Sequence, residues 1–371
     1  MRDSPGAPVT RHSPRVSVEI PTLLLILADY LGWLAITFAY TRWPLALVAP
    51  ITVVLITLHS SLQHEIVHGH PTRWEWVNRL FAVVPLSLWL PYDRYHHTHR
   101  AHHINSRLTD PLDDPESYYW RPEDLTGLNP VSRFLHEVQQ TLAGRVVLGS
   151  FWRIAMFLRD EARTLLHAEK RTLIRNEQSV RHIWLEHLAW CLPVVLWLKL
   201  VCGMPLWIYF VAMVVPANGL LLIRAFAEHR WSPGVRERIA LVEGSWILGP
   251  LFLFNNLHSL HHEEPRMPWY EYNARYRLLR SKLIAENGGL VYSTYFEVAR
   301  RYLFRRHDVL PHPLGRVPSA PGREVPSAAY GVRPADRSRR PLPRGPTAEA
   351  ARTTLHSLPQ SPRAEAAQPA R

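Results

Sequence analysis

The stretch HEIVHGH, residues 64–70, directly follows a long apolar run and places His64 and His68 four residues apart. On a helix that continues out of the apolar run, residues four apart lie on one face, so both imidazoles point the same way. Two imidazoles do not complete a metal site, because zinc in proteins takes about three or four protein ligands. If this stretch binds a metal, the rest of the chain must supply further ligands.

Four apolar segments are long enough to cross a membrane, for which a helix needs about 20 residues. Short links join them into two pairs, and no convincing cleavage site follows the first, as a secretory signal peptide would require. Two shorter apolar pieces, 80–90 and 239–254, contain proline or glycine and predict re-entrant or interfacial segments. We therefore expect an all-α integral membrane protein with four transmembrane helices in two hairpins, at residues 22–40, 44–62, 183–201 and 205–226.

The chain divides into three parts by composition. A polar segment, 1–19, precedes a membrane domain at 20–305 that includes a histidine-rich helical cap. Residues 310–371 are rich in Pro, Arg, Ala and Ser, which predicts disorder. The two cysteines, Cys191 and Cys202, lie inside or beside an apolar segment, so a disulfide framework and a Cys-ligated metal site are excluded.

The net charge of +12 favours a membrane surface as partner over nucleic acid, because no nucleic-acid-binding motif accompanies it. Both links between paired spans are nearly uncharged, whereas the N-terminus, residues 63–182 and the C-terminal part are rich in arginine. Positively charged segments stay on the cytoplasmic side. Every histidine cluster is therefore expected on that side of the membrane.

Two more clusters repeat the spacing H-x-x-H-H, one within HHTHRAHH at 96–103 and one in HSLHH at 258–262. Residues i, i+3 and i+4 share one side of a helix, so each cluster offers three nitrogens to one region. A lone histidine in FAEHRW follows the fourth span. The candidate metal ligands are His64, His68, His99, His102, His103, His229, His258, His261 and His262. Nine imidazoles exceed the needs of one zinc and suit two metal ions, although imidazole binds iron, zinc and copper alike.

The order of these boxes, with paired spans between them, resembles the membrane fatty acid desaturase superfamily over residues 20–305. That superfamily also includes hydroxylases and carotenoid ketolases. The resemblance implies that the nine histidines hold two non-haem irons, which use O2 to remove hydrogens from an unactivated carbon chain. TDPLDDPES, residues 109–117, resembles the acidic stretch that trails the second box. Glu65 departs from the family pattern, since many members have aspartate there.

The resemblance implies a fatty acyl desaturase acting on a lipid substrate from the cytoplasmic side. O2 reduction also needs two electrons, and the sequence contains no flavin, haem-attachment or ferredoxin motif. A separate electron donor, a ferredoxin or a cytochrome, is therefore expected. A carotenoid ketolase or hydroxylase and an alkane or lipid hydroxylase would use the same iron centre and remain open.

H-E-x-x-H is also the signature of zinc proteases, in which the glutamate is the general base. The metzincin third histidine is absent and no later span offers an aspartate, which disfavours this alternative. Glu65 is then expected to orient an imidazole or to be solvated. A non-catalytic membrane scaffold is the third hypothesis.

The other histidines are predicted not to bind metal. His59, His70, His96 and His97 crowd the boxes, and His96 is the easiest to misassign. Interfacial or surface positions are expected for His136, His167, His182 and His187, and solvated ones for His12, His307, His312 and His356.

Several polar residues near the boxes have two possible roles. Asp110, Asp113 and Asp114 suit a capped turn or a contact to a ligand, and Asn255 and Asn256 suit a ligand contact or a helix end. Asp29 lies within the first span, where an acidic residue is functional by default or only satisfies a neighbouring helix. Residues 131–166 alternate arginine with apolar residues and predict amphipathic helices on the membrane or over the metal site.

Overall fold

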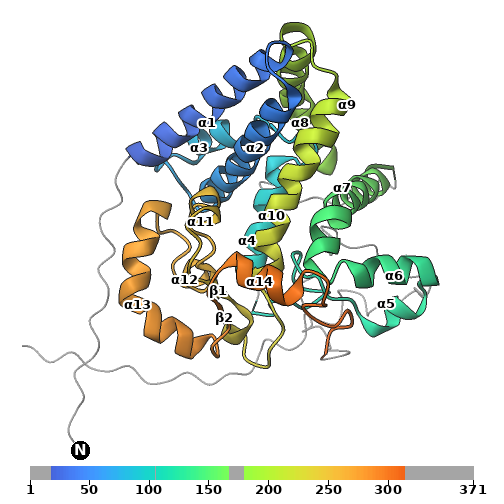
Figure 1. The fold of residues 1–371 in the computed structure, drawn as a ribbon, viewed down its shortest axis with the longest axis vertical. Coiled ribbons are helices and arrows are strands. Elements are labelled where there is room, and N and C mark those ends of the chain that lie inside the picture. Colours follow the sequence, from blue (N-terminus) through green and yellow to red (C-terminus); the bar gives the residue numbers. More distant parts are fainter. Residues whose placement is uncertain (1–17, 105, 167–178, 314–371) are drawn as a thin grey trace, which may run out of the picture. The chain divides into compact units, whose positions relative to one another are not determined.

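A computed structural model describes residues 18–104, 106–166 and 179–313, which are mainly helical. Strands β1 (Leu241–Val242) and β2 (Val291–Tyr292) pair in parallel, with Leu241 opposite Val291. The structure confirms an all-α membrane protein, apart from this small sheet (Figure 1).

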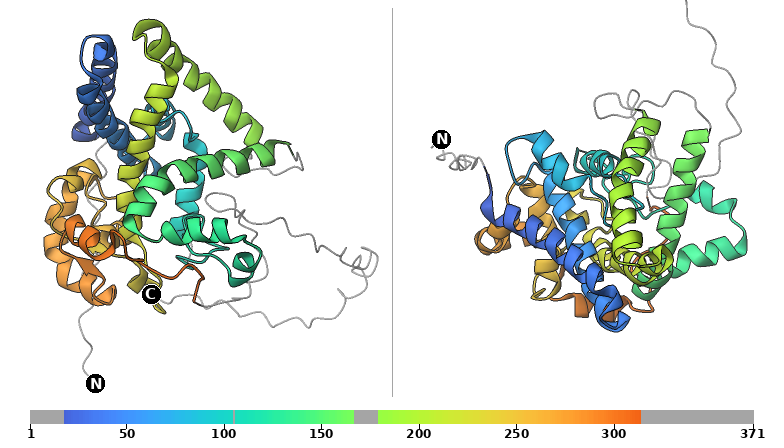
Figure 2. Two further views of the ribbon diagram at one scale, coloured as in Figure 1. Left: turned by 45° about the vertical axis from the view of Figure 1, so that its right-hand side comes forward. Right: turned by 90° about the horizontal axis from the view of Figure 1, so that it is seen from above.

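Fourteen helices surround the strands in the described ranges (Figures 1 and 2). They are α1 (Ile20–Phe38), α2 (Leu45–Val67), α3 (Glu75–Ala82), α4 (Tyr92–Ile104), α5 (Pro122–Thr126), α6 (Pro130–Val138), α7 (Leu142–Leu166), α8 (Val180–Leu196), α9 (Leu206–Tyr209), α10 (Val215–Glu228), α11 (Leu248–Leu251), α12 (His258–Glu263), α13 (Tyr272–Glu286) and α14 (Tyr295–Tyr302). Single turns of 3₁₀-helix occupy Ala39–Thr41, Arg236–Arg238 and Trp269–Glu271, and π-helical turns occupy Trp197–Val201 and Phe210–Val214.

Four helices of the described ranges are each long and apolar enough to cross a membrane, as the sequence predicts. They cover Ile20–Thr41, Leu45–Val67, Val180–Val201 and Leu206–Glu228. The second runs five residues beyond its predicted end at 62, so it carries the first histidine box out of the apolar run. A fifth span would require α6 and α7 together, although these two helices meet at 119°.

Residues 83–91, within and after the predicted re-entrant piece, are not helical. Their backbone carbonyls therefore lack helical hydrogen bonds, which is costly among membrane spans unless other groups satisfy them. Side chains of other elements satisfy them. The hydroxyl of Tyr209 donates to the carbonyl of Leu86 at 2.7 Å, and Nε2 of His187 lies 3.1 Å from the carbonyl of Leu88. These bonds tie the connection before α4, which carries the second histidine box, to two spans.

The second apolar piece, 239–254, is not one helix. It forms β1 and the short α11, and it then reaches the third box through two residues with positive φ, Leu253 at 50° and Phe254 at 59°. Leu241 and Phe252 are buried in apolar clusters, and the cluster of Leu241 also contains Leu257 and Leu260 of the third-box segment. The cap is thus built from short irregular elements that only tertiary packing holds.

Four histidines predicted at the surface or in solvent are buried instead: His136, His187, His307 and His312. Each has aromatic or hydrogen-bonding partners, such as the indole of Trp120 4.4 Å from the ring of His136. His182 is exposed as predicted, whereas His12, His167 and His356 lie outside the described residues.

The prediction that the disordered tail starts at residue 310 places its start too early. The carbonyl of Leu310 accepts a hydrogen bond from the backbone N–H of Trp120, and the N–H of His312 donates to the carbonyl of Trp120. Leu310 is buried by this pairing. The rest of the predicted tail, 314–371, lies outside the described residues.

The Tyr209→Phe variant should unfold more easily than the wild type, by about 1–3 kcal/mol. Its hydroxyl donates to Leu86 and accepts from the indole N–H of Trp33 at 2.9 Å, so its removal leaves two buried groups unsatisfied. Thermal unfolding of the detergent-solubilised protein measures the effect. Trp207→Phe, at an exposed position near the start of the same span, is the control. Equal melting temperatures for the two variants would contradict the proposed anchoring.

Candidate metal centre

The histidine boxes and His229 lie in or directly after four helices, α2, α4, α10 and α12. His64 lies in the last turn of α2, and His68 directly follows that helix. The second box belongs to α4 and the third to α12, while His229 follows the last residue of α10. Because α2 and α10 are themselves spans, the membrane domain fixes the position of three of these nitrogens.

The nine candidate histidines come together in two groups. Within each group the potential ligand atoms all lie within 4.8 Å of one another. One group contains five, namely His64, His68, His99, His103 and His261, and the other contains four, namely His102, His229, His258 and His262. Each H-x-x-H-H box is divided between the groups, so neither group is formed by one segment.

The Nε2 atoms point at one another across each group. In the five-histidine group the Nε2 atoms of His261 and His103 are 3.0 Å apart, and those of His68 and His99 are 3.1 Å apart. Neighbouring ligands at about 90° on metal–nitrogen bonds of about 2.1 Å would be separated by about 3.0 Å. The observed spacing therefore suits adjacent ligands of a metal with more than four ligands.

This donor set fits a metal better than a hydrogen-bond network. Each neutral imidazole carries one proton, and several of these rings already use Nδ1–H for another partner, which leaves Nε2 as a lone pair. Lone pairs facing one another at 3 Å repel unless a cation lies between them. Two ions, one per group, would satisfy all nine nitrogens.

Burial keeps most of these rings in the neutral form that binds metals. It lowers the pKa of His258, His261 and His262 well below the usual range, and neighbouring imidazoles lower it further. His102 differs, because burial lowers its pKa but the carboxylates of Asp114 and Glu116 outweigh burial and raise it to about 9. A carboxylate partner makes an imidazole more basic and thus a stronger ligand.

Four rings have a partner at Nδ1 that fixes their orientation. The partner atoms are a carboxylate oxygen of Glu116 for His99 (2.9 Å), a carboxylate oxygen of Asp114 for His102 (2.8 Å), the amide oxygen of Asn255 for His258 (2.9 Å) and the hydroxyl of Tyr272 for His261 (2.9 Å). These contacts hold the Nε2 atoms toward the centre of each group.

The acidic stretch at 109–117 both shapes a turn and contacts candidate histidines, the two roles that the sequence left open. Asp114 accepts hydrogen bonds from the backbone N–H groups of Thr109 and Glu116 at 2.8 and 2.9 Å, which shape the turn, and it also contacts His102. Glu116 contacts His99, although sequence reasoning had singled out only the aspartates. Burial opposes ionisation of Glu116, but the imidazoles of His102 and His99 hold its pKa well below its usual range.

Tyr272 is the other residue that sequence reasoning missed. It begins α13, eleven residues beyond its partner His261, and no local pattern marks it. From the sequence, Asn255 had two possible roles, contact to a metal-binding residue or the end of a helix. In the structure it contacts two of the candidate histidines. Its amide oxygen faces His258, and its amide nitrogen lies 3.3 Å from Nε2 of His64.

Glu65 and His59 have partners away from the two groups. A carboxylate oxygen of Glu65 accepts a hydrogen bond from the backbone N–H of Trp269 at 3.2 Å, so the side chain links α2 to the cap. Nδ1 of His59 lies 3.4 Å from a carboxylate oxygen of Asp29, between the first two spans. Neither His59 nor His96 belongs to either group of nitrogens.

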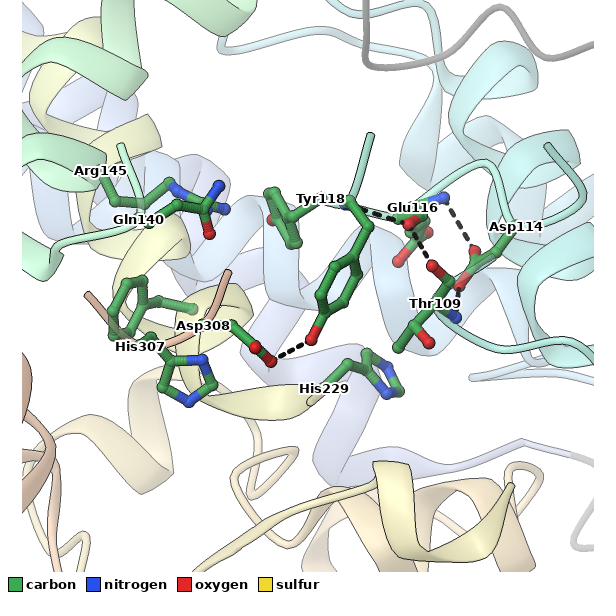
Figure 3. A pocket seen from close by; sticks show the side chains of 12 residues that line it. Thr109, Asp114, Glu116, Tyr118, Gln140, Arg145, His229, His307 and Asp308 are labelled. Atoms are coloured by element: carbon green, nitrogen blue, oxygen red, sulfur yellow. Dashed lines mark hydrogen bonds between the residues drawn. The ribbon is translucent and has the colours of Figure 1, made fainter. Parts of the chain in front are cut away.

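Two cavities meet beside the four-histidine group. A long cleft runs between α2, α7 and α10 past apolar residues such as Ile56, Val214 and Leu222. A smaller cavity, drawn in Figure 3, contains Arg145 and Asp308 among its lining residues. Three residues line both: Glu116, Tyr118 and His229.

Apolar spans and two buried groups of histidines that could hold metal ions define a membrane protein of the histidine-box class. The family model for fatty acid desaturase matches residues 41–296, so the chain belongs to the fatty acid desaturase family. This match confirms the resemblance predicted from the box spacing. No curated protein matches the chain.

Asp114→Asn should bind metal about 10- to 100-fold more weakly than the wild type, because a neutral amide supports the candidate ligand His102 less well. Metal retained after dialysis against graded chelator concentrations gives the affinity. Asp113→Asn is the matched control, because Asp113 pairs with Arg107 and is not bonded to a histidine of either group. Equal losses in both variants would show that Asp114 acts only on the turn.

Proposed function

We propose that this protein is an O2-dependent di-iron oxidoreductase that introduces a double bond into the acyl chain of a membrane lipid. The observation that carries the proposal is the convergence of nine imidazoles from four helices into two groups. Membership of a family that acts on lipids in membranes supports it. The family also makes an oxidoreductase the expected class of enzyme.

The ligands would divide as the two groups do, five histidines around one iron and four around the other. When bound, the iron pair supplies the oxidising power needed to remove hydrogen from a methylene group, which no side chain can do. Imidazole nitrogens suit iron among other metals. Glu116, Asp114, Asn255 and Tyr272 orient the rings that they contact.

The cleft between α2 and α10 is the proposed substrate site. Ile56, Val214, Leu221 and Leu222 offer an apolar surface to a carbon chain, and the cleft also reaches His229 of the four-histidine group. A chain placed there would lie beside the metal centre and away from bulk water. The neighbouring spans would let a lipid enter from the bilayer.

The electrons would come from a separate protein, a ferredoxin or a cytochrome, bound on the cytoplasmic side. Arginines before the first span, after the second and after the fourth support this orientation. A basic surface would also attract an acidic donor, which speeds association of oppositely charged proteins.

Zinc proteolysis receives less support. His64 and His68 are grouped with three more imidazoles, whereas a zinc protease leaves an open position beside three ligands. Glu65, which would be the general base, accepts a hydrogen bond from the backbone of Trp269.

Purified wild-type protein should contain about two irons per chain, as a site with two metal ions requires. His261→Ala should reduce that content, because it removes a nitrogen from the five-histidine group. His182→Ala, at an exposed position, should leave it unchanged. Elemental analysis decides the matter, and tightly bound zinc with little iron would instead favour the protease.

Cells that express the protein should accumulate acyl chains with new double bonds, and cells that express His102→Ala should not. Mass spectrometry of extracted lipids detects the change. Oxygenated lipids would indicate a hydroxylase, and oxygenated carotenoids would indicate a ketolase or carotenoid hydroxylase. The absence of any lipid product in the presence of iron and a reductant would argue against oxidation altogether.

A further inference from the structure

His229 is held differently from the candidate ligands of the histidine boxes. It follows α10 with an extended backbone, φ −131° and ψ 136°. Its buried Nδ1 has no hydrogen-bond partner in the part of the chain that the structure describes. Four other rings have an Nδ1 partner that fixes their orientation. The position of the His229 imidazole within the four-histidine group therefore depends on the backbone that follows α10.

Two hydrogen bonds tie that backbone to the ends of the acidic stretch. The backbone N–H of Trp231, two residues after His229, donates to the hydroxyl oxygen of Tyr119 at 2.8 Å. Nη1 of Arg238 donates to the carbonyl of Leu108 at 2.6 Å. The segment after His229 is thus held at two points against the stretch whose carboxylates orient other rings of the centre.

The hydroxyl of Tyr119 has a second partner, the carboxylate of Asp308, to which it donates a hydrogen bond. Figure 3 draws this bond at Asp308, with His229 lining the same cavity. Burial and the charge of Asp308 both raise the pKa of Tyr119, so the hydroxyl keeps its proton and donates. One oxygen therefore joins three segments: the end of the acidic stretch, the backbone after His229, and the segment around Asp308.

Asp308 belongs to residues 307–313, here named the strap. The strap lies beyond residue 296, the last residue that the family model matches. Trp120 exchanges backbone hydrogen bonds with Leu310 and His312 of the strap, at 3.0 and 2.8 Å. Leu310 and His312 are buried. The strap is therefore packed against the residue next to Tyr119, which holds the carboxylate of Asp308 in reach of the hydroxyl.

We propose that Tyr119 and Asp308 are positioning residues for the four-histidine group, and that the strap supports metal binding there. Tyr119 joins the strap to the backbone just after His229, so loss of this bridge would let that backbone and the imidazole shift. The inference rests on the two-metal centre of the proposed function, and it adds to that centre a segment outside the matched residues. The five-histidine group does not contain His229 and should keep its metal.

A role in folding alone would have different consequences, and Tyr276 provides the matched comparison. Its hydroxyl also donates to a carboxylate, that of Glu243, at 2.6 Å. Tyr276 is buried in an apolar cluster of the cap, and within the described ranges its hydroxyl is bonded to no histidine. Removal of either hydroxyl should lower the stability of the fold, but only removal of the Tyr119 hydroxyl should weaken metal binding.

Cobalt(II) loading of the detergent-solubilised full chain tests the proposal, because the visible absorption of bound cobalt reports the ligand geometry. The wild type should hold about two ions per chain, as a site with two metals requires. Tyr119→Phe should lose one of them at about tenfold lower chelator concentration, since a residue that orients a ligand is weakened. The absorption bands of that ion should also shift. Tyr276→Phe should match the wild type in both respects.

Two substitutions of Asp308 separate the hydrogen bond from folding. Asp308→Asn keeps an oxygen that accepts from the hydroxyl of Tyr119, so its cobalt affinity should stay close to that of the wild type. Asp308→Leu has no acceptor and should behave as Tyr119→Phe does. Thermal unfolding of the same samples shows whether each variant is folded.

Three results would overturn the proposal: both ions held by Tyr119→Phe as in the wild type, both ions lost together, or equal loss in Asp308→Asn and Asp308→Leu. A wild-type chain that holds fewer than two ions would contradict the two-metal centre, and the proposal with it. The assay measures metal alone, so failure to find a lipid product would count against the proposed function and not against the positioning roles.

Discussion

The structure depends on holding nine imidazoles, most of them neutral, with neighbouring Nε2 atoms about 3 Å apart in a buried space. Such an arrangement is unfavourable in itself, because the rings repel and each loses its hydration. Only a cation in each group, or rigid support from the surrounding protein, makes it stable. Both features of the site follow from this constraint: burial keeps most of the rings neutral, and Glu116, Asp114, Asn255 and Tyr272 fix the orientation of four of them.

The support comes from spans that continue beyond the apolar region. Helix α2 carries His64 at its end and α10 stops one residue before His229, so two of the spans position two of the candidate ligands. The segment 83–91 connects the spans to α4. The hydroxyl of Tyr209 holds this segment in place by donating a hydrogen bond to a backbone carbonyl, which lipid could not do. The same spans border the long cleft. A change that destabilises the packing of these spans should therefore also disturb the geometry of the two histidine groups.

Much of the site could be predicted from spacing alone. H-x-x-x-H and H-x-x-H-H place their imidazoles on one helix face wherever the segment is helical, and α2, α4 and α12 are helical. The residues beside the ligands were harder to find. Tyr272 reaches His261 only because α13 folds back against α12, and Glu116 was overlooked among more conspicuous aspartates. The burial of His187 and His307 was mispredicted, since His187 meets the carbonyl of Leu88, 99 residues away, and His307 meets the hydroxyl of Tyr292 in β2.

The sequence by itself determined the four apolar helices, the three histidine boxes and the family, because each depends on residues close together along the chain and on helical period. Tertiary structure alone decided how the boxes divide into groups of five and four, which polar residues orient the rings, and where Tyr119 meets Asp308 and the backbone that follows His229. The histidine groups join segments far apart in the chain, as His103 and His261 show, 158 residues apart, whereas the orienting residues lie nearer to their rings along the chain. Their geometry arises from packing in three dimensions, which no local pattern encodes.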